Sequence, residues 1–192
     1  VELESGDRVG YEHLVIAVGL ETRYDAVPGL EDAMKRPDGV SSYTLDLAAK
    51  ASHALRDVRG GTVVFVQQPE PASAAGVSQK PMYLACDYWR RTGVLQDIHV
   101  IMVAPDETVF GIPEIDRELE RKVAEYGIDL RTGTEMIAVD AANREITVHQ
   151  ESGRLTERLS YDVLNVEPPQ SAPDWLADLA AIGDPGGFVD VD

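Results

Sequence analysis

A continuous apolar run at Val63–Val66, followed by a loop and then a helical pattern, most constrains how this chain can fold. Four apolar residues in succession are typical of a strand buried on both faces, as in a parallel sheet. The helical pattern begins after Ser78, the expected N-cap, and ends at Gly93. Its apolar stripe has the spacing of one helix face and is formed by Met82, Cys86 and Trp89. This order predicts a β-α-β unit, in which ligands bind at the loop following the strand.

The remaining patterns extend this unit into an α/β domain. Helices are expected over 44–58 and from Pro113 to about Gly127, and buried strands over 98–104, 128–131 and 161–166. A further apolar segment, Tyr11–Gly19, predicts a strand near the N-terminus, although nothing upstream supplies it with a neighbour. Alternating segments at 135–140, 145–150 and 155–160 predict an antiparallel meander. The expected fold is a three-layer (ββα) Rossmann-like domain of the FAD/NAD(P)-binding type, with a central parallel sheet.

Charge and composition exclude several classes of function. The chain has 192 residues, of which 34 are acidic and 17 basic, for a net charge of −17. We therefore expect no nucleic-acid partner. The four histidines are scattered without ligand-like spacing, so no metal site is expected. The single cysteine, Cys86, lies on an apolar helix stripe and is expected to be structural. Since no run is long enough to cross a bilayer, we predict a cytoplasmic location.

The loop after Val63–Val66 lacks the motif that binds a dinucleotide. The G-x-G-x-x-G sequence lets the main chain approach a pyrophosphate. In this chain the corresponding segment, 69–77, contains one glycine and two prolines, and prolines remove amide donors. Lys80 places a cation beside the loop, although an ordinary exposed first helical turn would explain it equally well. The segment therefore has the strand-loop-helix order of an NAD site but lacks the glycines that let the main chain bind its phosphates.

Several short motifs, in order along nearly the whole chain, resemble those of the sulfide:quinone oxidoreductases. This family belongs to the pyridine nucleotide-disulfide oxidoreductase-like flavoproteins, together with flavocytochrome c sulfide dehydrogenases and type II NADH dehydrogenases. The resemblance is carried by Tyr11–Gly19, Val27–Leu30, Ser41–Tyr43, Ala75–Lys80, Met82–Leu84, Phe110–Pro113, Leu159–Leu164, Pro168-Pro169, Pro173-Asp174 and Gly187–Asp192.

The resemblance implies that FAD is the cofactor of the whole protein and that this chain is its second-domain fragment. In the family, an N-terminal G-x-G-x-x-G domain and a late Gly-Asp motif hold FAD, and we expect both to lie outside this chain. Residues 1–40 are expected to be a linker on the FAD-domain side, 41–168 the NAD(P)-binding-like second domain, and 169–192 a connector back to the FAD domain. The fragment alone is expected to be inactive and to bind no FAD tightly.

The resemblance also implies site residues and partners. Cofactor contacts are expected at Ala17, Gly19, Ala75, Gly76 and Lys80. Expected partners are the missing FAD-binding segments, a quinone and a membrane surface for the whole protein, and a homodimer is left open. Electrons would pass from a sulfide-like donor through FAD to the quinone.

One departure from the family concerns its chemistry. The family carries a redox cysteine immediately before the Ala-Gly pair of the loop, and this chain has Ala74 there, so no catalytic residue is assigned. Two other functions stay open. One is an NAD(P)H:quinone reductase of the type II NADH dehydrogenase kind, with Asp106 or Glu107 holding a ribose; the other is a scaffold domain without catalysis.

Overall fold

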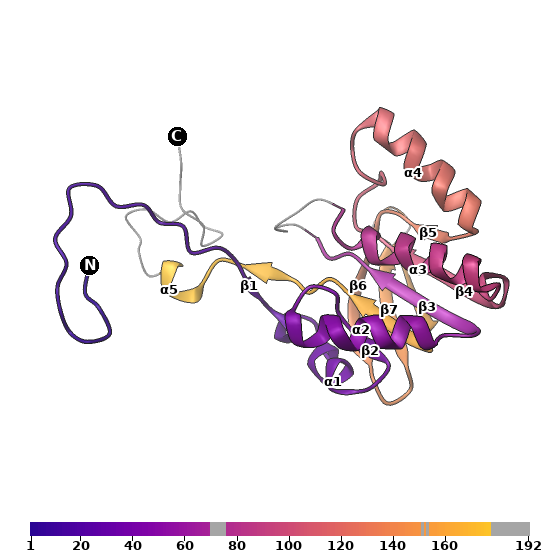
Figure 1. The fold of residues 1–192 in the computed structure, drawn as a ribbon, viewed down its shortest axis with the longest axis horizontal. Helices are drawn as coiled ribbons and strands as arrows, with labels where there is room; N and C mark the ends of the chain where they lie inside the picture. Colours follow the sequence, from indigo (N-terminus) through magenta and orange to yellow (C-terminus); the bar gives the residue numbers. More distant parts are fainter. Residues whose placement is uncertain (70–75, 151, 153, 178–192) are drawn as a thin grey trace. The chain divides into compact units, whose positions relative to one another are not determined.

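The computed structural model describes residues 1–69, 76–150, 152 and 154–177. It divides the chain into two compact units, one formed by residues 22–171 and the other by 1–21 with 172–192. The larger unit contains the sheet, its covering helices and the meander (Figure 1). The domain boundaries expected at residues 40 and 168 stay predictions.

A five-stranded parallel sheet forms the centre of the larger unit, in the order β2-β9-β3-β4-β5. Its strands are β2 (Gly39–Val40), β3 (Gly61–Val66), β4 (Ile98–Val103), β5 (Asp129–Arg131) and β9 (Val163–Val166). In β3, all four residues of Val63–Val66 are buried, as the continuous apolar run predicts. Val66 pairs with Val103 on one side and Val166 on the other, so β3, β4 and β9 end at the same edge.

Three helices cover one face of the sheet and pack on it through an apolar cluster that includes Phe65 and Trp89. They are α2 (Leu45–Asp57), α3 (Gln79–Thr92) and α4 (Pro113–Tyr126). The Trp89 indole also donates a hydrogen bond of 2.8 Å to the Leu55 carbonyl, which fixes α3 against α2. Cys86 is fully buried in the same cluster, as expected for a structural cysteine.

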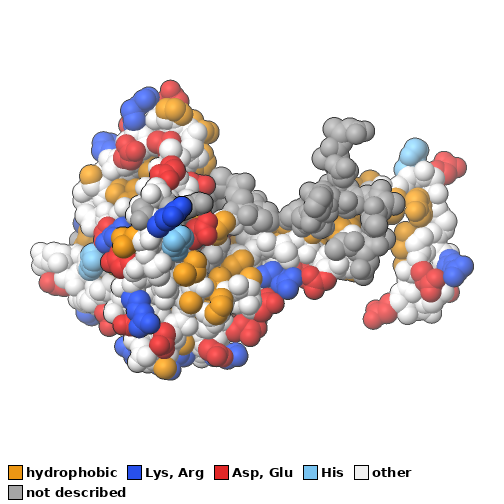
Figure 2. All heavy atoms as spheres, turned by 180° about the vertical axis from the view of Figure 1, so that it is seen from behind, with side chains coloured by type: hydrophobic (Ala, Val, Ile, Leu, Met, Phe, Trp, Pro, Cys, Tyr) orange, Lys and Arg blue, Asp and Glu red, His pale blue; other side chains and the backbone are white. Residues whose placement is uncertain are grey.

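The opposite face is covered by α1 (Leu30–Lys35) and by an antiparallel meander, which completes the predicted three layers. The meander consists of β6 (Thr134–Asp140), β7 (Glu145–Gln150) and β8 (Leu155–Ser160). Its inward-facing Met136, Ile146 and Val148 pack on Val64 and Val66 of the sheet. On the face shown in Figure 2, acidic and basic side chains are interspersed. The predicted fold class is confirmed.

The remaining elements are short. They are β1 (Glu21–Thr22), the 3-10 turns η1 (Tyr24–Ala26) and η2 (Leu95–Asp97), β10 (Gln170–Ser171) and α5 (Asp174–Ala177). The structure includes α1 and β2, which the sequence patterns did not predict, because each is too short to show a period.

Two local predictions are wrong. Tyr11–Gly19 forms no strand, and its Val15 side chain is 86% exposed, because no neighbouring strand pairs with this apolar segment within the described residues. Ser78 does not cap α3: its backbone is already helical, and its hydroxyl donates to the Gln67 side chain at 3.1 Å instead. Gly93 does end α3 in the left-handed conformation.

Candidate functional site

The carboxyl ends of β3 and β9 and the start of α3 bring a polar cluster together. Successive strand residues point to opposite faces, so Asn165 and Glu167 face the α2–α3 layer while Leu164 and Val166 face the meander. Next to them the Ser42 hydroxyl lies 3.3 Å from the Asn165 side-chain oxygen, and Ser78 contacts Gln67. Ligands of parallel α/β sheets bind at this edge.

Glu167 is the most perturbed acidic group of this cluster. Its side chain is buried, with the residue 5% exposed, and its Oε1 atom has no hydrogen-bond partner among the described residues. Burial in a medium of low polarity disfavours the ionised carboxyl and raises the pKa of Glu167 to about 7, although the Ser78 hydroxyl counteracts part of this effect. Glu167 can therefore exchange a proton near neutral pH.

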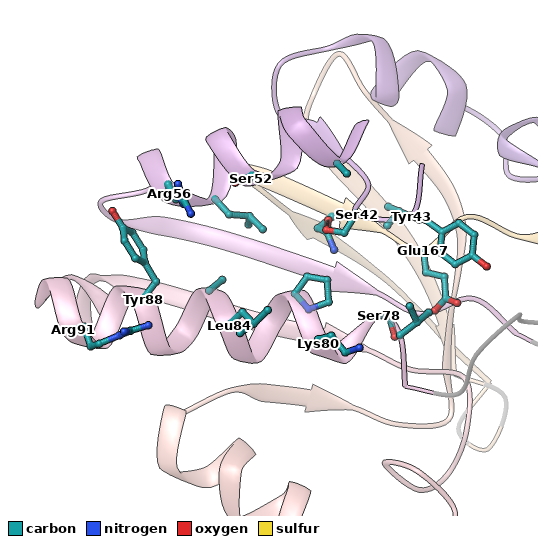
Figure 3. A pocket seen from close by; sticks show the side chains of 17 residues that line it. Ser42, Tyr43, Ser52, Arg56, Ser78, Lys80, Leu84, Tyr88, Arg91 and Glu167 are labelled. Atoms are coloured by element: carbon teal, nitrogen blue, oxygen red, sulfur yellow. Dashed lines mark hydrogen bonds between the residues drawn. The ribbon is translucent and has the colours of Figure 1, made fainter. Parts of the chain in front are cut away.

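A cavity of about 510 Å³ opens between α2 and α3 above this cluster. Figure 3 shows Glu167, Ser78 and Tyr43 at one end of it and Arg56, Tyr88 and Arg91 at the other. We call this cavity the α2–α3 groove. Its volume lies within the range of about 300–1,000 Å³ that is usual for small-molecule sites.

The predicted cofactor residues belong to two different units of the chain. Ala17 and Gly19 are exposed and belong to the smaller unit, whereas Gly76 and Lys80 belong to the larger one. Ala75, like the redox position Ala74, lies outside the described residues. Of the five, Lys80 lines the α2–α3 groove. The cofactor role of all five residues stays a prediction.

The backbone conformation of Gly76 and the neighbouring Phe110 ring explain why this position is a glycine. Its φ angle of +69° is left-handed, and a Cβ atom there would lie 3.2 Å from the Phe110 ring. The Phe110 ring thus packs closely against this glycine. Pro69 precedes it in the sequence and has no amide donor, and the Glu167 carboxyl lies at the same edge, so the described residues there are unfavourable for a dinucleotide phosphate.

Cys86 cannot replace the cysteine missing at position 74. Its thiol is fully buried, and burial raises the pKa of Cys86 to about 12, so the reactive thiolate is strongly disfavoured. Among the residues that the structure describes, no group of three or more histidine, cysteine, aspartate or glutamate side chains is placed to hold a metal ion. No helix in the described part of the chain is long and apolar enough to span a bilayer.

Sequence reasoning missed most of the groove. Ser42, Arg56, Arg91, Asn165 and Glu167 come from three distant segments that the sheet topology brings together. The available signal was the alternation along 163–167, which places two polar side chains on the inward face of a buried strand.

Comparison with known proteins gives relatives over the whole chain. Mitochondrial sulfide:quinone oxidoreductase from Mus musculus is 29% identical over 194 aligned positions, covering 100% of this chain and 43% of the mouse protein. The protein of the same name from Dictyostelium discoideum is 24% identical and covers 98% of this chain and 42% of the relative. This chain thus spans less than half the length of these relatives. No model of a protein family matches it.

Solved structures agree on the fold. The sulfide:quinone oxidoreductase from Aquifex aeolicus superimposes with a TM-score of 0.80 at 19% identity, over 97% of this chain and 43% of that chain. NDH2 from Plasmodium falciparum gives a TM-score of 0.63 at 14% identity, over 93% of this chain and 39% of that chain. The resemblance that the sequence motifs indicate is confirmed along the whole of this chain.

Proposed function

We propose that this chain, which resembles the sulfide:quinone oxidoreductases throughout, forms the second, NAD(P)-binding-like domain of an FAD-dependent oxidoreductase that reduces a quinone. The observation that carries the proposal is the similarity to mitochondrial sulfide:quinone oxidoreductases over 98–100% of the chain. In the whole protein, FAD would supply the capacity to take up and pass on electrons. Since quinones reside in membranes, we propose that the whole protein works at a membrane surface.

We propose that segments beyond this chain supply the phosphate-binding loop for FAD. The described residues include no glycine-rich loop between a strand and a helix, and the Phe110 ring packs closely against Gly76. In this proposal residues 1–40 and 169–192 connect to the FAD-binding side, and 41–168 form the second domain. Ala17 and Gly19 would then contact the cofactor only once those segments are present.

The proposed electron donor approaches the loop at 69–79. With Ala74 in place of the family's cysteine and Cys86 buried, this loop has no thiolate to form a covalent bond with sulfide sulfur. We therefore propose that the loop positions the donor without forming a covalent sulfur intermediate, and that sulfide is a poor donor for this protein.

Three measurements test the proposal. Titration of this chain with FAD, followed by flavin fluorescence, is expected to show no tight binding, and stoichiometric quenching would contradict the division of the flavin site. In the whole protein we expect the yellow absorbance of bound flavin and little sulfide-dependent quinone reduction. A74C is then expected to raise the sulfide-dependent rate, while A72C, in the same loop, is the matched control. Purified whole protein without flavin would refute the function itself.

Oxidation of NADH is the competing function, and Asp106 is the residue that favours it. Asp106 follows β4 at the same sheet edge, and its carboxylate lies 3.4 Å from the Gln67 side-chain amide, where a ribose hydroxyl could replace the amide. Rapid bleaching of the flavin by NADH, lost in D106N, would support this function over the sulfide-type donor.

A further inference from the structure

The middle of the α2–α3 groove is mostly aliphatic, with Ser52 as a polar residue among the apolar ones. Its two helix walls carry small and branched apolar side chains, namely Ala48 and Leu55 from α2 and Pro81, Leu84 and Ala85 from α3. Leu84 is 65% exposed, so its side chain is accessible to a ligand in the groove. Apolar walls of this kind bury a hydrocarbon chain favourably.

The charges that line the groove have the opposite sign to the chain as a whole. Arg56, Lys80 and Arg91 line it together with a single carboxyl, Glu167, although the net charge of the chain is −17. Arg56 makes no ion pair with any described residue. The Arg91 guanidinium pairs with Asp87 at 2.6 Å, and Asp87 also pairs with Arg90, which has Glu125 as a second partner. The end of the groove near Arg56 and Arg91 therefore attracts an anion.

The opposite end of the groove contains an unsatisfied acceptor. Glu167 is only 5% exposed, it lines the groove, and its Oε1 atom has no hydrogen-bond partner among the described residues. A buried polar atom in this state is costly, which indicates that a group beyond the described residues completes it. At pH 8, above its pKa of about 7, the Glu167 carboxyl is ionised and only accepts hydrogen bonds, so the partner bound at that pH must donate one.

We propose that the α2–α3 groove binds an extended aliphatic carboxylate that carries a hydroxyl group at its far end. The carboxylate head pairs with Arg56 and Arg91, the chain lies along Leu55, Pro81 and Leu84, and the hydroxyl donates to Glu167 (Figure 3). The opposite orientation is unfavourable because Glu167 would repel a carboxylate. From Thr44 to Arg56 the α2 wall is about 18 Å long, at about 1.5 Å per residue. This inference does not depend on the proposed redox function, since it uses only residues of the groove.

The experiment is calorimetric titration of this chain at pH 8 with three probes below their micellar concentrations. They are 12-hydroxydodecanoate, dodecanoate, which lacks the hydroxyl, and 1,12-dodecanediol, which lacks the carboxylate. We expect the hydroxy acid to bind with the highest affinity and one-to-one stoichiometry. R56Q and R91Q are each expected to weaken its binding about tenfold, the usual value of a charge-assisted contact, and to leave the affinity for the diol unchanged. R117Q, an exposed arginine on α4, is the matched control and should change nothing.

Variants at the other end test the hydroxyl contact. E167L removes the acceptor and should reduce the affinity for the hydroxy acid to that for dodecanoate, while E167Q, which keeps an acceptor oxygen, should retain part of the difference. A larger loss in K80Q than in R56Q would refute the assigned orientation. Absence of saturable binding of all three probes, or equal binding in wild type and R56Q, would overturn the site. Binding only to vesicles of anionic phospholipid, with none to the free probes, would overturn it as well, because it would indicate a lipid surface instead.

Discussion

Replacing Glu167 with glutamine removes the one described carboxyl whose pKa is raised to about 7. In the unfolded chain this group titrates at its ordinary value of 4.5. At pH values between 4.5 and about 7, Glu167 is protonated in the folded protein and ionised in the unfolded chain, so a rise in pH favours unfolding. The contribution of protonated Glu167 to the free energy of unfolding is complete below pH 4.5 and is lost as the pH rises through about 7. At about 1.4 kcal/mol per pH unit, the whole difference is about 3 kcal/mol, and most of it falls between pH 5 and pH 8.

The measurement is urea unfolding of the wild type and E167Q at several pH values from 5 to 8. Other carboxylates titrate in both proteins, so their contributions cancel in the difference between the two free energies of unfolding. We expect E167Q to gain about 2–3 kcal/mol in free energy of unfolding relative to the wild type over this range. E120Q, an exposed glutamate on α4, is the control and should show no such trend. A difference between wild type and E167Q that does not change with pH would refute the reasoning, because it would mean that Glu167 ionises normally in the folded protein.

Three further substitutions or reactions test the packing that supports the groove. G76A should destabilise the chain by about 2–3 kcal/mol, since the φ of Gly76 is +69°, in the left-handed region, and the new Cβ would press on Phe110. Gly93 also has a left-handed backbone but no atom near its Cβ position, so G93A should cost only about 1–2 kcal/mol; chemical unfolding measures both losses. K50M should cost about 2 kcal/mol or more, because the Lys50 ammonium donates to three main-chain carbonyls that methionine would leave unpaired; thermal unfolding measures the loss, and an unchanged melting temperature would contradict it. The Cys86 thiol should resist alkylation by iodoacetamide in the native protein and react readily in urea, because burial raises its pKa to about 12; modification at the rate of a free thiol would show that α3 opens.

Sequence patterns predicted the fold well where the spacing of apolar residues and glycines within one segment determines its structure. The run Val63–Val66 is buried on both faces, and Gly93 and Gly127 end their helices in the left-handed conformation. Sequence patterns failed where the structure of a segment depends on a neighbouring segment. Tyr11–Gly19 has the composition of a strand, but a strand is stable only when a neighbouring strand completes its hydrogen bonds. Ser78 has the right type for an N-cap, yet Gln67 competes successfully for its hydroxyl.

The site was less predictable than the fold because its residues have no common motif. The loop at 69–79 was expected from the strand-loop-helix order, but the acid beside it, Glu167, arrives on β9, which joins β3 only after the chain has formed β4, β5 and the meander. Nothing near Glu167 in the sequence predicts that Arg56 and Arg91 lie along the same groove. Only the parallel pairing of β9 with β3 brings them together, and this pairing is a property of the whole sheet.

The burial of Glu167 and its unpaired oxygen also bear on why residue 167 is a glutamate. A glutamine or leucine there would fit between the same neighbours and avoid the free energy lost on burying an ionisable group, so packing alone does not explain a glutamate. The residue is buried at 5% exposure, its Oε1 atom is unpaired among the described residues, and it lines a cavity whose other charged residues are cations. A binding partner that donates to the carboxylate would repay the loss, and the stability gained by E167Q should then disappear when that partner is added in excess.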